Sequence, residues 1–481
     1  MHRRDFFIKA SVGVSCFASV NLYEAFMPSE SEAFPTSRGI GIEEGLYILE
    51  NGKENNIMPE IRPEIVSKPR AVFLIETHVD AKKDKEGYDG YFKEAVPQLR
   101  AEGKRVASEI FVKGTIKGGS TFIKPNFTYI PEHRNHRTNG VYSSPDFIVG
   151  VVDFLREIRN TNLICGEGPT NAINHRHGGV YEALDSGNVD MIEFGYDKFT
   201  HYKKNELNWL KVPNSRIWKN IPYCRPVADK DNFLINIAKL KVHETAITTL
   251  TVKNLQGCVP KGYGQFCTTW ESLEETAARD GINFKRDFYE DFQPRVEVSY
   301  QKHIKDDYKR FDHTGSYRRY LEKGGWEAFR KAKKTPKDLQ EFVKNTGPLM
   351  QEELWFQRGL DNASILKPRI NIIEGIIGLD GTALNNHKIG EDHLCNLVIA
   401  GLSPFEVDAV GNYIMGHDPR EIWYTRTAKE RGLGECDINN IEIYRIKNGE
   451  IIPVKNPAEI KRYPLGLNWA LQDDPSERLF W

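Results

Sequence analysis

Residues 233–243 read FLINIAKLKVH, an apolar run that ends in alternating basic residues. The run Phe233–Ala238 has the composition of a strand that is buried on both faces of a sheet. If the strand stays extended to its end, the period of two places Lys239, Lys241 and His243 on one face. We therefore expect three basic side chains to converge at the carboxyl end of an inner strand.

A second group of polar residues follows this strand and includes Thr248, Thr249, Lys253 and Asn254. We expect a helix near Ala246–Gln256, whose first N–H groups and positive dipole face the end of the strand. Ligands of open α/β sheets bind at the carboxyl ends of the strands. An anion such as a carboxylate or a phosphate is therefore the expected ligand, and Asn254 is expected to contact the substrate.

Crowding and burial lower the pKa of a lysine, which would suit proton transfer or covalent chemistry at Lys239, Lys241 or Lys253. We expect Lys239 and Lys241 to bind the anion and His243 to move protons. Lys253 would hold a substrate or cofactor group. The alternative is that these lysines pair with nearby acids or extend to solvent.

Strands alternate with helices on both sides of this stretch, which predicts an α/β fold with a largely parallel sheet covered by helices. Strands are expected at residues 71–75, 121–126, 162–165, 191–194, 369–373 and 394–400. Helices are expected at 180–184, at 404–415, and after Ser144-Pro145, where a capping residue precedes an N1 proline. A terminal hairpin is expected over 441–449.

The 481 residues, 40% of them hydrophobic, are enough for one enlarged α/β unit or for several domains. Composition becomes charged and aromatic between about Gly262 and Asn362. The expected domains are an export signal (1–33), a linker (34–69), the N-terminal part of the α/β unit (70–261), a mainly helical charged insertion (262–362), the C-terminal part of the α/β unit (363–455) and a tail (456–481).

Charge and cysteine content limit the partners. The 66 Lys and Arg nearly cancel the 67 Asp and Glu, so no overall field favours a polyanion, and nucleic acid is not an expected partner. The seven cysteines include no Cys-x-x-Cys pair, so the chain has no ferredoxin-type cluster motif and no zinc ribbon. We interpret the cysteines beyond the leader as buried thiols.

The N-terminus carries Arg3-Arg4 followed by aromatic residues, Lys9 and a mildly apolar run from Ala10 to Val20. This pattern is typical of a twin-arginine export signal and predicts a periplasmic protein that engages the twin-arginine export machinery. The alternative is a basic amphipathic helix. No other apolar stretch approaches the roughly 20 residues that span a bilayer, so we expect no stable membrane span in the mature protein. Lipidation of Cys16 stays open.

Three further motifs follow strands or precede a helix. Lys124-Pro125-Asn126 ends a strand and should reach the same edge of the sheet, where Lys124 and Asn126 would bind substrate. Arg137 adds a cation shortly before the capped helix. Glu167 stands in a Gly-Glu-Gly-Pro turn, which presents it as a general acid or base, or as a ligand. The alternative is that Glu167 is structural.

Two acids follow the insertion, Glu374 at the end of a strand and Asp408 early in a helix, and both are candidate substrate ligands. Asp408 could instead be a helix-start residue favoured by the dipole. His175 and His177 would supply two metal ligands from an extended segment, but no third ligand is fixed by spacing, so the metal stays unknown.

Taken in order, these motifs resemble the domain of unknown function 362 family over about 300 residues. The segments that carry the resemblance are Lys124-Pro-Asn, Thr138 to Pro145, Gly166-Glu-Gly-Pro, Lys239 to His243, Lys253 to Gly257, Glu374-Gly-Ile and Ser403 to Val410. The family commonly has aspartate where this chain has Glu374, which keeps the carboxylate. Some members carry an iron–sulfur segment that this chain lacks.

A more distant likeness is to nickel-pincer lactate racemases, in which a histidine stands ten residues before the lysine that carries the cofactor. His243, Lys253, Gly257 and Pro260 match that spacing, whereas the later nickel-binding histidine has no equivalent. The likeness implies a two-lobed protein with a cleft between the lobes and a ligand role for Lys253, but not nickel. The cofactor therefore stays unknown, with Lys253 as its possible site.

These inferences support an enzyme that acts on a small anionic substrate, a hydroxy acid or sugar acid, by racemisation, epimerisation or a redox step. The same pocket would also serve an extracytoplasmic anion-binding protein without catalysis, because donors placed around an anion serve either task. Two further hypotheses are an iron–sulfur-linked electron-transfer protein and a structural or assembly factor.

Overall fold

The computed structural model describes residues 39–85, 90–127, 136–168, 178–194, 206–214, 220–243, 247–259, 348–381, 391–463 and 465. The chain divides into two compact units, Met1–Ser37 with Cys267–Leu354, and Arg38–Phe266 with Trp355–Trp481. The fold and the site below belong to the second unit. The expected export signal, the part of the expected insertion before Pro348, and His175 and His177 lie outside the described residues.

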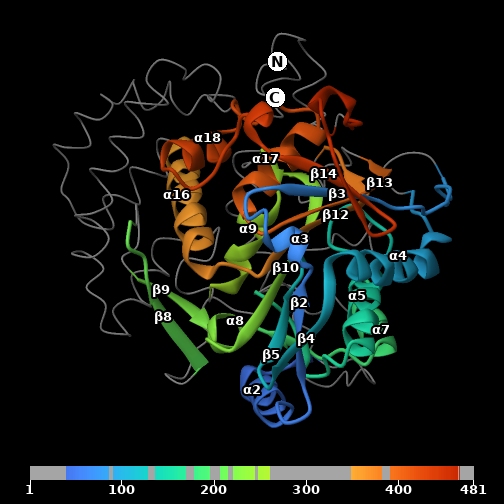
Figure 1. Ribbon diagram of the computed structural model, residues 1–481, viewed down its shortest axis with the longest axis vertical. Helices are drawn as coiled ribbons and strands as arrows, with labels where there is room; N and C mark the ends of the chain where they lie inside the picture. Colours follow the sequence, from blue (N-terminus) through green and yellow to red (C-terminus); the bar gives the residue numbers. More distant parts are fainter. Residues whose placement is uncertain are drawn as a thin grey trace, which may run out of the picture. The chain divides into compact units, whose positions relative to one another are not determined.

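A mixed sheet of eleven strands forms the centre of this unit (Figure 1). Ten of the strands follow the order β1 (Gly39–Ile40), β7 (Met191–Glu193), β6 (Leu163–Glu167), β5 (Ser120–Lys124), β10 (Asn232–His243), β12 (Ile370–Leu379), β13 (Asp392–Gly401), β3 (Val72–Glu76), β14 (Ile443–Lys447) and β15 (Glu450–Pro453), and the eleventh, β11 (Ile247–Thr249), pairs with β10 outside this order. The six strands from β1 to β12 are parallel, and β13 is antiparallel to both neighbours. The mostly parallel sheet is confirmed.

Alternate residues of β10 enter two separate cores, as expected for a strand that is buried on both faces. Ile235 and Ile237 pack with apolar residues of α4 (Ala95–Ile110), α5 (Pro145–Glu157) and α7 (Val180–Ser186). Ala238, Leu240 and Val242 pack instead with α17 (Pro404–Ile414) and with Leu250, which precedes α9 (Thr251–Asn254). Helices therefore flank the sheet on both faces, and Figure 1 shows α4, α5 and α7 on the side opposite α9 and α17.

Local sequence explains two of the expected elements well. The Ser144 side chain accepts a hydrogen bond from the Phe147 N–H and so caps α5 ahead of Pro145. The β14–β15 hairpin turns through Asn448 and Gly449, whose φ angles are 51° and 82°. Two consecutive residues with positive φ are what a two-residue hairpin turn requires.

The expected helix near Ala246–Gln256 is wrong in its first half. Residues Ile247–Thr249 form β11, which pairs antiparallel with the end of β10. The helix α9 has only four residues, and a 3-10 turn, Leu255–Cys258, continues it. The β-branched run Ile247-Thr-Thr favours strand pairing over the first helical turn.

Several elements carry no sequence signal that predicts them. The expected linker folds from Gly39 onward into β1, α2 (Ile42–Asn51), β2 (Ile57–Ile61) and α3 (Pro63–Val66), and β2 pairs with β4 (Phe111–Lys117). A second small sheet joins β8 (Leu207–Lys211) to β9 (Asn220–Cys224), followed by α8 (Arg225–Ala228). The helix α18 (Trp423–Glu430) is equally unexpected, whereas most of α16 (Pro348–Leu366) lies in the stretch expected to be a mainly helical insertion. Among the described helices, none combines the length and apolar character needed to cross a bilayer.

Candidate functional site

Lys239 continues the α5-facing side of β10, but it lies in a closed ion pair. Its Nζ is 2.6 Å from Glu374 Oε2, and both side chains are 0% exposed. The parallel register of β10 and β12 places the two residues opposite one another. The Glu374 carboxylate also accepts hydrogen bonds from the backbone N–H groups of Ser144 and Ile376 at 3.1 and 3.0 Å. The expectation that a lysine could pair with a nearby acid holds at this position.

Lys241, two residues further on, is also buried, and its ammonium donates a hydrogen bond to the neutral carbonyl of Val141. Burial, followed by the charges of Lys253 and Lys239, holds the pKa of Lys241 well below its ordinary value. The Coulombic influences at this position are mostly positive, with Glu167 as the opposing charge. A negative group placed beside Lys241 would therefore be stabilised.

His243 ends the strand and keeps some exposed surface. Burial of the imidazole, and after it the charges of Lys253 and Lys241, hold the pKa of His243 well below 6.5. The imidazole is consequently neutral at neutral pH and able to accept a proton. The charge of Lys253 lowers the pKa of both His243 and Lys241, so the three basic groups influence one another electrostatically.

A second buried ion pair joins the ends of β5 and β6. Lys124 Nζ lies 2.6 Å from Glu167 Oε1, with side-chain exposures of 1% and 6%. Burial raises the pKa of Glu167, while the charge of Lys124 opposes that shift. The Glu167 carboxylate also accepts the N–H groups of Phe127 and Gly168, each at 2.7 Å. Glu167 is thus held in place from three sides.

Gly257 is required beside this pair. A Cβ atom at this position would lie 2.3 Å from Glu167 Oε1 and 2.8 Å from Lys124 Cε, distances that real Cβ atoms do not show. The backbone of the 3-10 turn therefore approaches the ion pair as closely as only glycine allows. This explains a glycine four residues after Lys253 in physical terms.

Asn254 connects the two strand ends. Its amide nitrogen donates to Lys124 O at 3.2 Å and to Asn236 Oδ1 at 2.8 Å. Its amide oxygen accepts from Lys124 Nζ at 3.3 Å and from Asn126 Nδ2 at 3.1 Å. Asn126 and Asn254, both predicted to bind substrate, are therefore bonded to each other. The Asn126 Oδ1 and Thr249 Oγ1 atoms are buried without a hydrogen-bond partner.

Asp408 joins α17 to the start of α9. One carboxylate oxygen accepts from the Thr251 N–H at 2.7 Å and from the Thr251 hydroxyl at 2.5 Å, and the other accepts from the Val252 N–H at 3.0 Å. Asp408 is fully buried, and burial raises its pKa to about 7. The residue lies in the second turn of its own helix and satisfies free N–H groups at the start of a different one.

Arg137 is held by acids of two helices. Its guanidinium pairs with Asp146 of α5 and, at 3.4 Å, with Glu182 of α7. The structure thus gives Arg137 a part in joining these helices near their N-termini.

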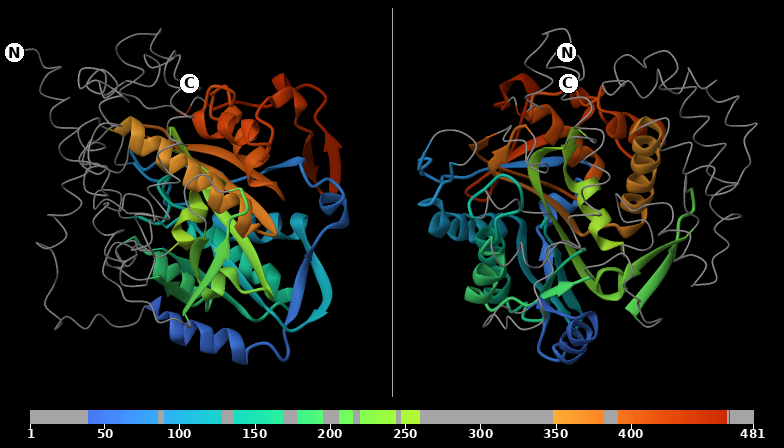
Figure 2. Two further views of the ribbon diagram at one scale, coloured as in Figure 1. Left: turned by 90° about the vertical axis from the view of Figure 1, so that its left-hand side faces the viewer. Right: turned by 180° about the vertical axis from the view of Figure 1, so that it is seen from behind.

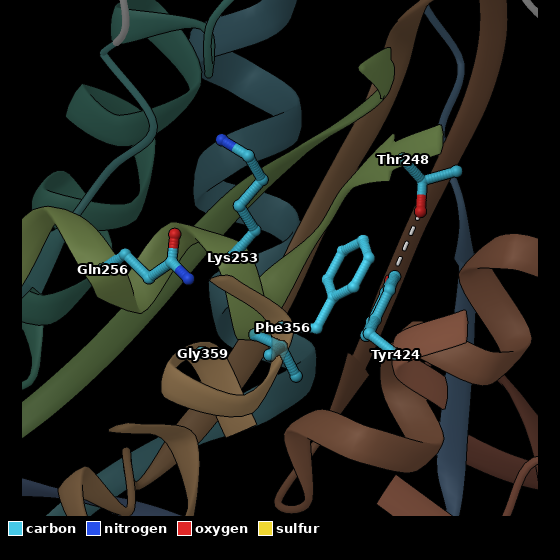
Figure 3. Close-up of a pocket in the computed structure, with 7 residues that line it drawn as sticks. Thr248, Lys253, Gln256, Phe356, Gly359 and Tyr424 are labelled. Atoms are coloured by element: carbon cyan, nitrogen blue, oxygen red, sulfur yellow. Dashed lines mark hydrogen bonds between the residues drawn. The ribbon is translucent and has the colours of Figure 1, made fainter. Parts of the chain in front are cut away.

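A small hollow lies beside α9 (Figure 3). It is lined by Thr248, Val252, Lys253, Gln256, Phe356, Gly359 and Tyr424. Sequence reasoning singles out Thr248 and Lys253 here, but misses Phe356 and Tyr424. These two come from α16 and α18, and nothing local in those segments indicates a site. Figure 2 shows α16 beside the α9 segment in a second view.

The described cysteines are poor metal ligands. Cys165, Cys224, Cys258, Cys395 and Cys436 are all buried and unbridged. Burial raises the pKa of each, to about 12 for Cys258 and Cys395, whereas metal binding needs the thiolate. Within the described segments, no cluster of three or more His, Cys, Asp or Glu side chains has an arrangement suited to a metal ion.

Comparison with protein families matches residues 121–412 to the family described as Domain of unknown function (DUF362). The match covers more than half of the 481-residue chain and includes all the site residues described above from Lys124 to Asp408. Neither the curated proteins nor the solved structures include a match to this chain. By the extent of the family match, the chain belongs to the DUF362 family.

Proposed function

We propose that this protein binds a small hydroxy-acid or sugar-acid anion at the carboxyl edge of the sheet and moves a proton on it with His243. The single observation that carries the proposal is the environment of Lys241. Its buried ammonium has a neutral carbonyl as its partner and lies among further lysine charges. Lys239 and Lys124, by contrast, each face a carboxylate at 2.6 Å.

Proton transfer needs a base that is neutral at working pH and within reach of the substrate carbon. In the proposed step, His243 removes the proton from the carbon that bears the carboxylate. The electron pair of the broken C–H bond is delocalised into the carboxylate, whose added charge Lys241 and Lys253 stabilise. Return of the proton to the opposite face of that carbon inverts its configuration, which completes a racemisation or epimerisation with no other reactant.

Buried polar atoms also favour a hydroxylated anion. The Asn126 amide nitrogen is committed to Asn254, which leaves Asn126 Oδ1 as a buried acceptor without a partner. A buried acceptor without a hydrogen bond is unfavourable, and a substrate hydroxyl could donate the missing hydrogen bond to it. The redox form of the reaction would need a hydride acceptor, and the distant racemase likeness implies that Lys253 would hold it.

Ligand-dependent stability tests the proposal on the full chain. We expect gluconate, glycerate or 2-hydroxybutyrate to raise the melting temperature relative to sodium chloride at equal ionic strength. Lys241→Met should abolish the shift, because it removes the buried ammonium. Lys104→Met, at an exposed lysine paired with Glu157 on the surface, should keep it. Unchanged shifts in the Lys241 variant would refute the site.

Exchange of the substrate C–H proton in D2O separates the enzyme from the alternative of a binding protein. If the NMR signal of the proton on the carbon next to the carboxylate disappears with the unaltered chain but persists with His243→Gln, the result supports catalysis. Stabilisation by anions without exchange supports an anion-binding protein. An iron–sulfur role is not favoured by the buried, high-pKa thiols of the described residues.

Export remains part of the proposal and rests on the sequence of residues 1–33, with the twin-arginine machinery as partner. Arg3→Lys combined with Arg4→Lys should retain the protein in the cytoplasm, whereas the unaltered chain should reach the periplasm. Cell fractionation measures this directly, and equal export of both forms would contradict a twin-arginine route. The two-lobed organisation with a helical insertion over 262–362 is likewise proposed from sequence alone.

A further inference from the structure

We infer that the hollow beside Lys253 receives a short apolar substituent of the substrate, so that the substrate is an alkyl-bearing hydroxy acid rather than a sugar acid. This inference rests on the proposed function and chooses between the two substrate classes that it allows. It is carried by three observations on the hollow: the apolar character of its wall, the commitment of its hydroxyl groups, and the position of Lys253.

The first observation is the apolar wall. Phe356 and Tyr424 face the hollow, and their rings stack with centroids 6.1 Å apart and an interplanar angle of 26°. Val252 and the carbon stem of Lys253 complete this side. Figure 3 shows the Phe356 ring between Lys253 and Tyr424. An alkyl group that binds here would exchange contact with water for contact with carbon atoms of the wall, and this burial of apolar surface is favourable.

The second observation concerns the hydroxyl groups in the wall. Thr248 donates to Asn412 Oδ1 at 2.7 Å, and the Asn412 amide donates to the Tyr424 hydroxyl at 3.2 Å. The Thr248 and Tyr424 hydroxyls also lie 3.3 Å apart (Figure 3). These hydroxyls satisfy one another, and Gln256, whose amide also lines the hollow, has an interaction of its own. A substrate hydroxyl that entered would therefore have to break existing contacts or lose its water without replacement. Either outcome disfavours the polyhydroxylated chain of a sugar acid.

The third observation is that Lys253 links the hollow to the anion site. Its side chain lines the hollow, and its charge lowers the pKa of both Lys241 and His243. In Figure 3 its ammonium points away from the Phe356 and Tyr424 rings. An anionic head beside these basic groups would therefore have its substituent directed along the Lys253 stem. Charge and apolar surface are arranged for a substrate with one anionic end and one alkyl end.

A matched pair of probes tests the inference. 2-Hydroxybutyrate and glycerate share the carboxylate and the 2-hydroxyl and differ in a terminal methyl against a terminal hydroxyl. We expect the full chain to bind 2-hydroxybutyrate at least about 10-fold more tightly, by calorimetric titration, since one apolar group in a fitted site is worth about that factor. Phe356→Ala should remove most of the preference. Tyr47→Ala, at an aromatic residue that is 68% exposed on α2, should leave it intact.

The outcomes separate this inference from the proposed function. Equal binding of the two probes, or tighter binding of glycerate, would overturn the alkyl-substituent inference while anion binding stands. A preference that survives in Phe356→Ala would place the substituent elsewhere and also overturn it. Failure of both probes and of gluconate to bind would remove the proposed function and the inference together. If Phe356→Ala does not fold, the milder Phe356→Leu should still reduce the preference.

Discussion

Glu374→Gln should lower the free energy of unfolding by about 3–5 kcal/mol, the usual cost of removing one partner of a buried ion pair. The reason is that the buried Lys239 side chain, which is 0% exposed, would lose the carboxylate that now compensates it at 2.6 Å. Glutamine retains only one acceptor oxygen for the Ser144 and Ile376 N–H groups that the carboxylate now binds. Urea unfolding of the variant and the unaltered chain, compared at one pH, measures the difference.

Two controls define this result. The double variant Lys239→Met with Glu374→Gln should recover most of the loss, because no isolated charge remains in the core. Glu157→Gln should cost less than about 1 kcal/mol, because its pair with Lys104 lies at the surface with exposures of 55% and 45%. A small effect of Glu374→Gln would instead mean that the pair contributes little to folding. In that case, contact with the substrate would be the role that remains for Glu374 and Lys239.

The second large effect is a pH dependence that originates at Asp408. Burial raises its pKa to about 7 from an ordinary value of 3.8. Between these two values the folded chain keeps the proton while the unfolded chain loses it, so stability falls as pH rises through this window. At about 1.4 kcal/mol per pKa unit, the loss approaches roughly 4 kcal/mol near pH 7. The asparagine side chain in Asp408→Asn cannot ionise, so this variant should not show the loss of stability with rising pH.

The measurement is the difference in unfolding free energy between the unaltered chain and Asp408→Asn at several values from pH 4.5 to 7.5. We expect the unaltered chain to lose stability relative to Asp408→Asn steadily as pH rises. Asp418→Asn provides a control of opposite sign, because the hydrogen bonds from Arg420 lower the pKa of Asp418. A difference that does not vary with pH would show that Asp408 does not take up a proton on folding.

Much of the fold is predictable because its elements carry local signals. The apolar run and the alternation in Phe233–His243 fix the inner strand, and Ser144-Pro145 fixes the start of α5. The segment Ile247–Thr249 is a strand inside a stretch expected to be helical, because its β-branched residues and its pairing with β10 together outweigh the helical pattern around it. The same is true of β1, which is a strand only because β7 lies beside it.

The site is predictable in its members but not in their bonds. Sequence places Lys239 and Lys241 on one face of a strand, and it places Glu374 and Glu167 at the ends of others. It does not reveal that Lys239 pairs with Glu374 while Lys241 bonds to a carbonyl, because register between distant strands decides which side chains meet. Nor does any local pattern single out Phe356 and Tyr424, which come to the hollow from separate helices.

The sequence by itself therefore determined the parallel core, the family and the gathering of basic residues at one sheet edge, since periodicity and motif order are local properties. The tertiary structure alone decided which charges are compensated, because the partners are separated by 135 residues in the Lys239–Glu374 pair. It also decided that Asp408 supports α9 rather than its own helix. Charge compensation depends on distance in space, and strand register and helix packing set that distance.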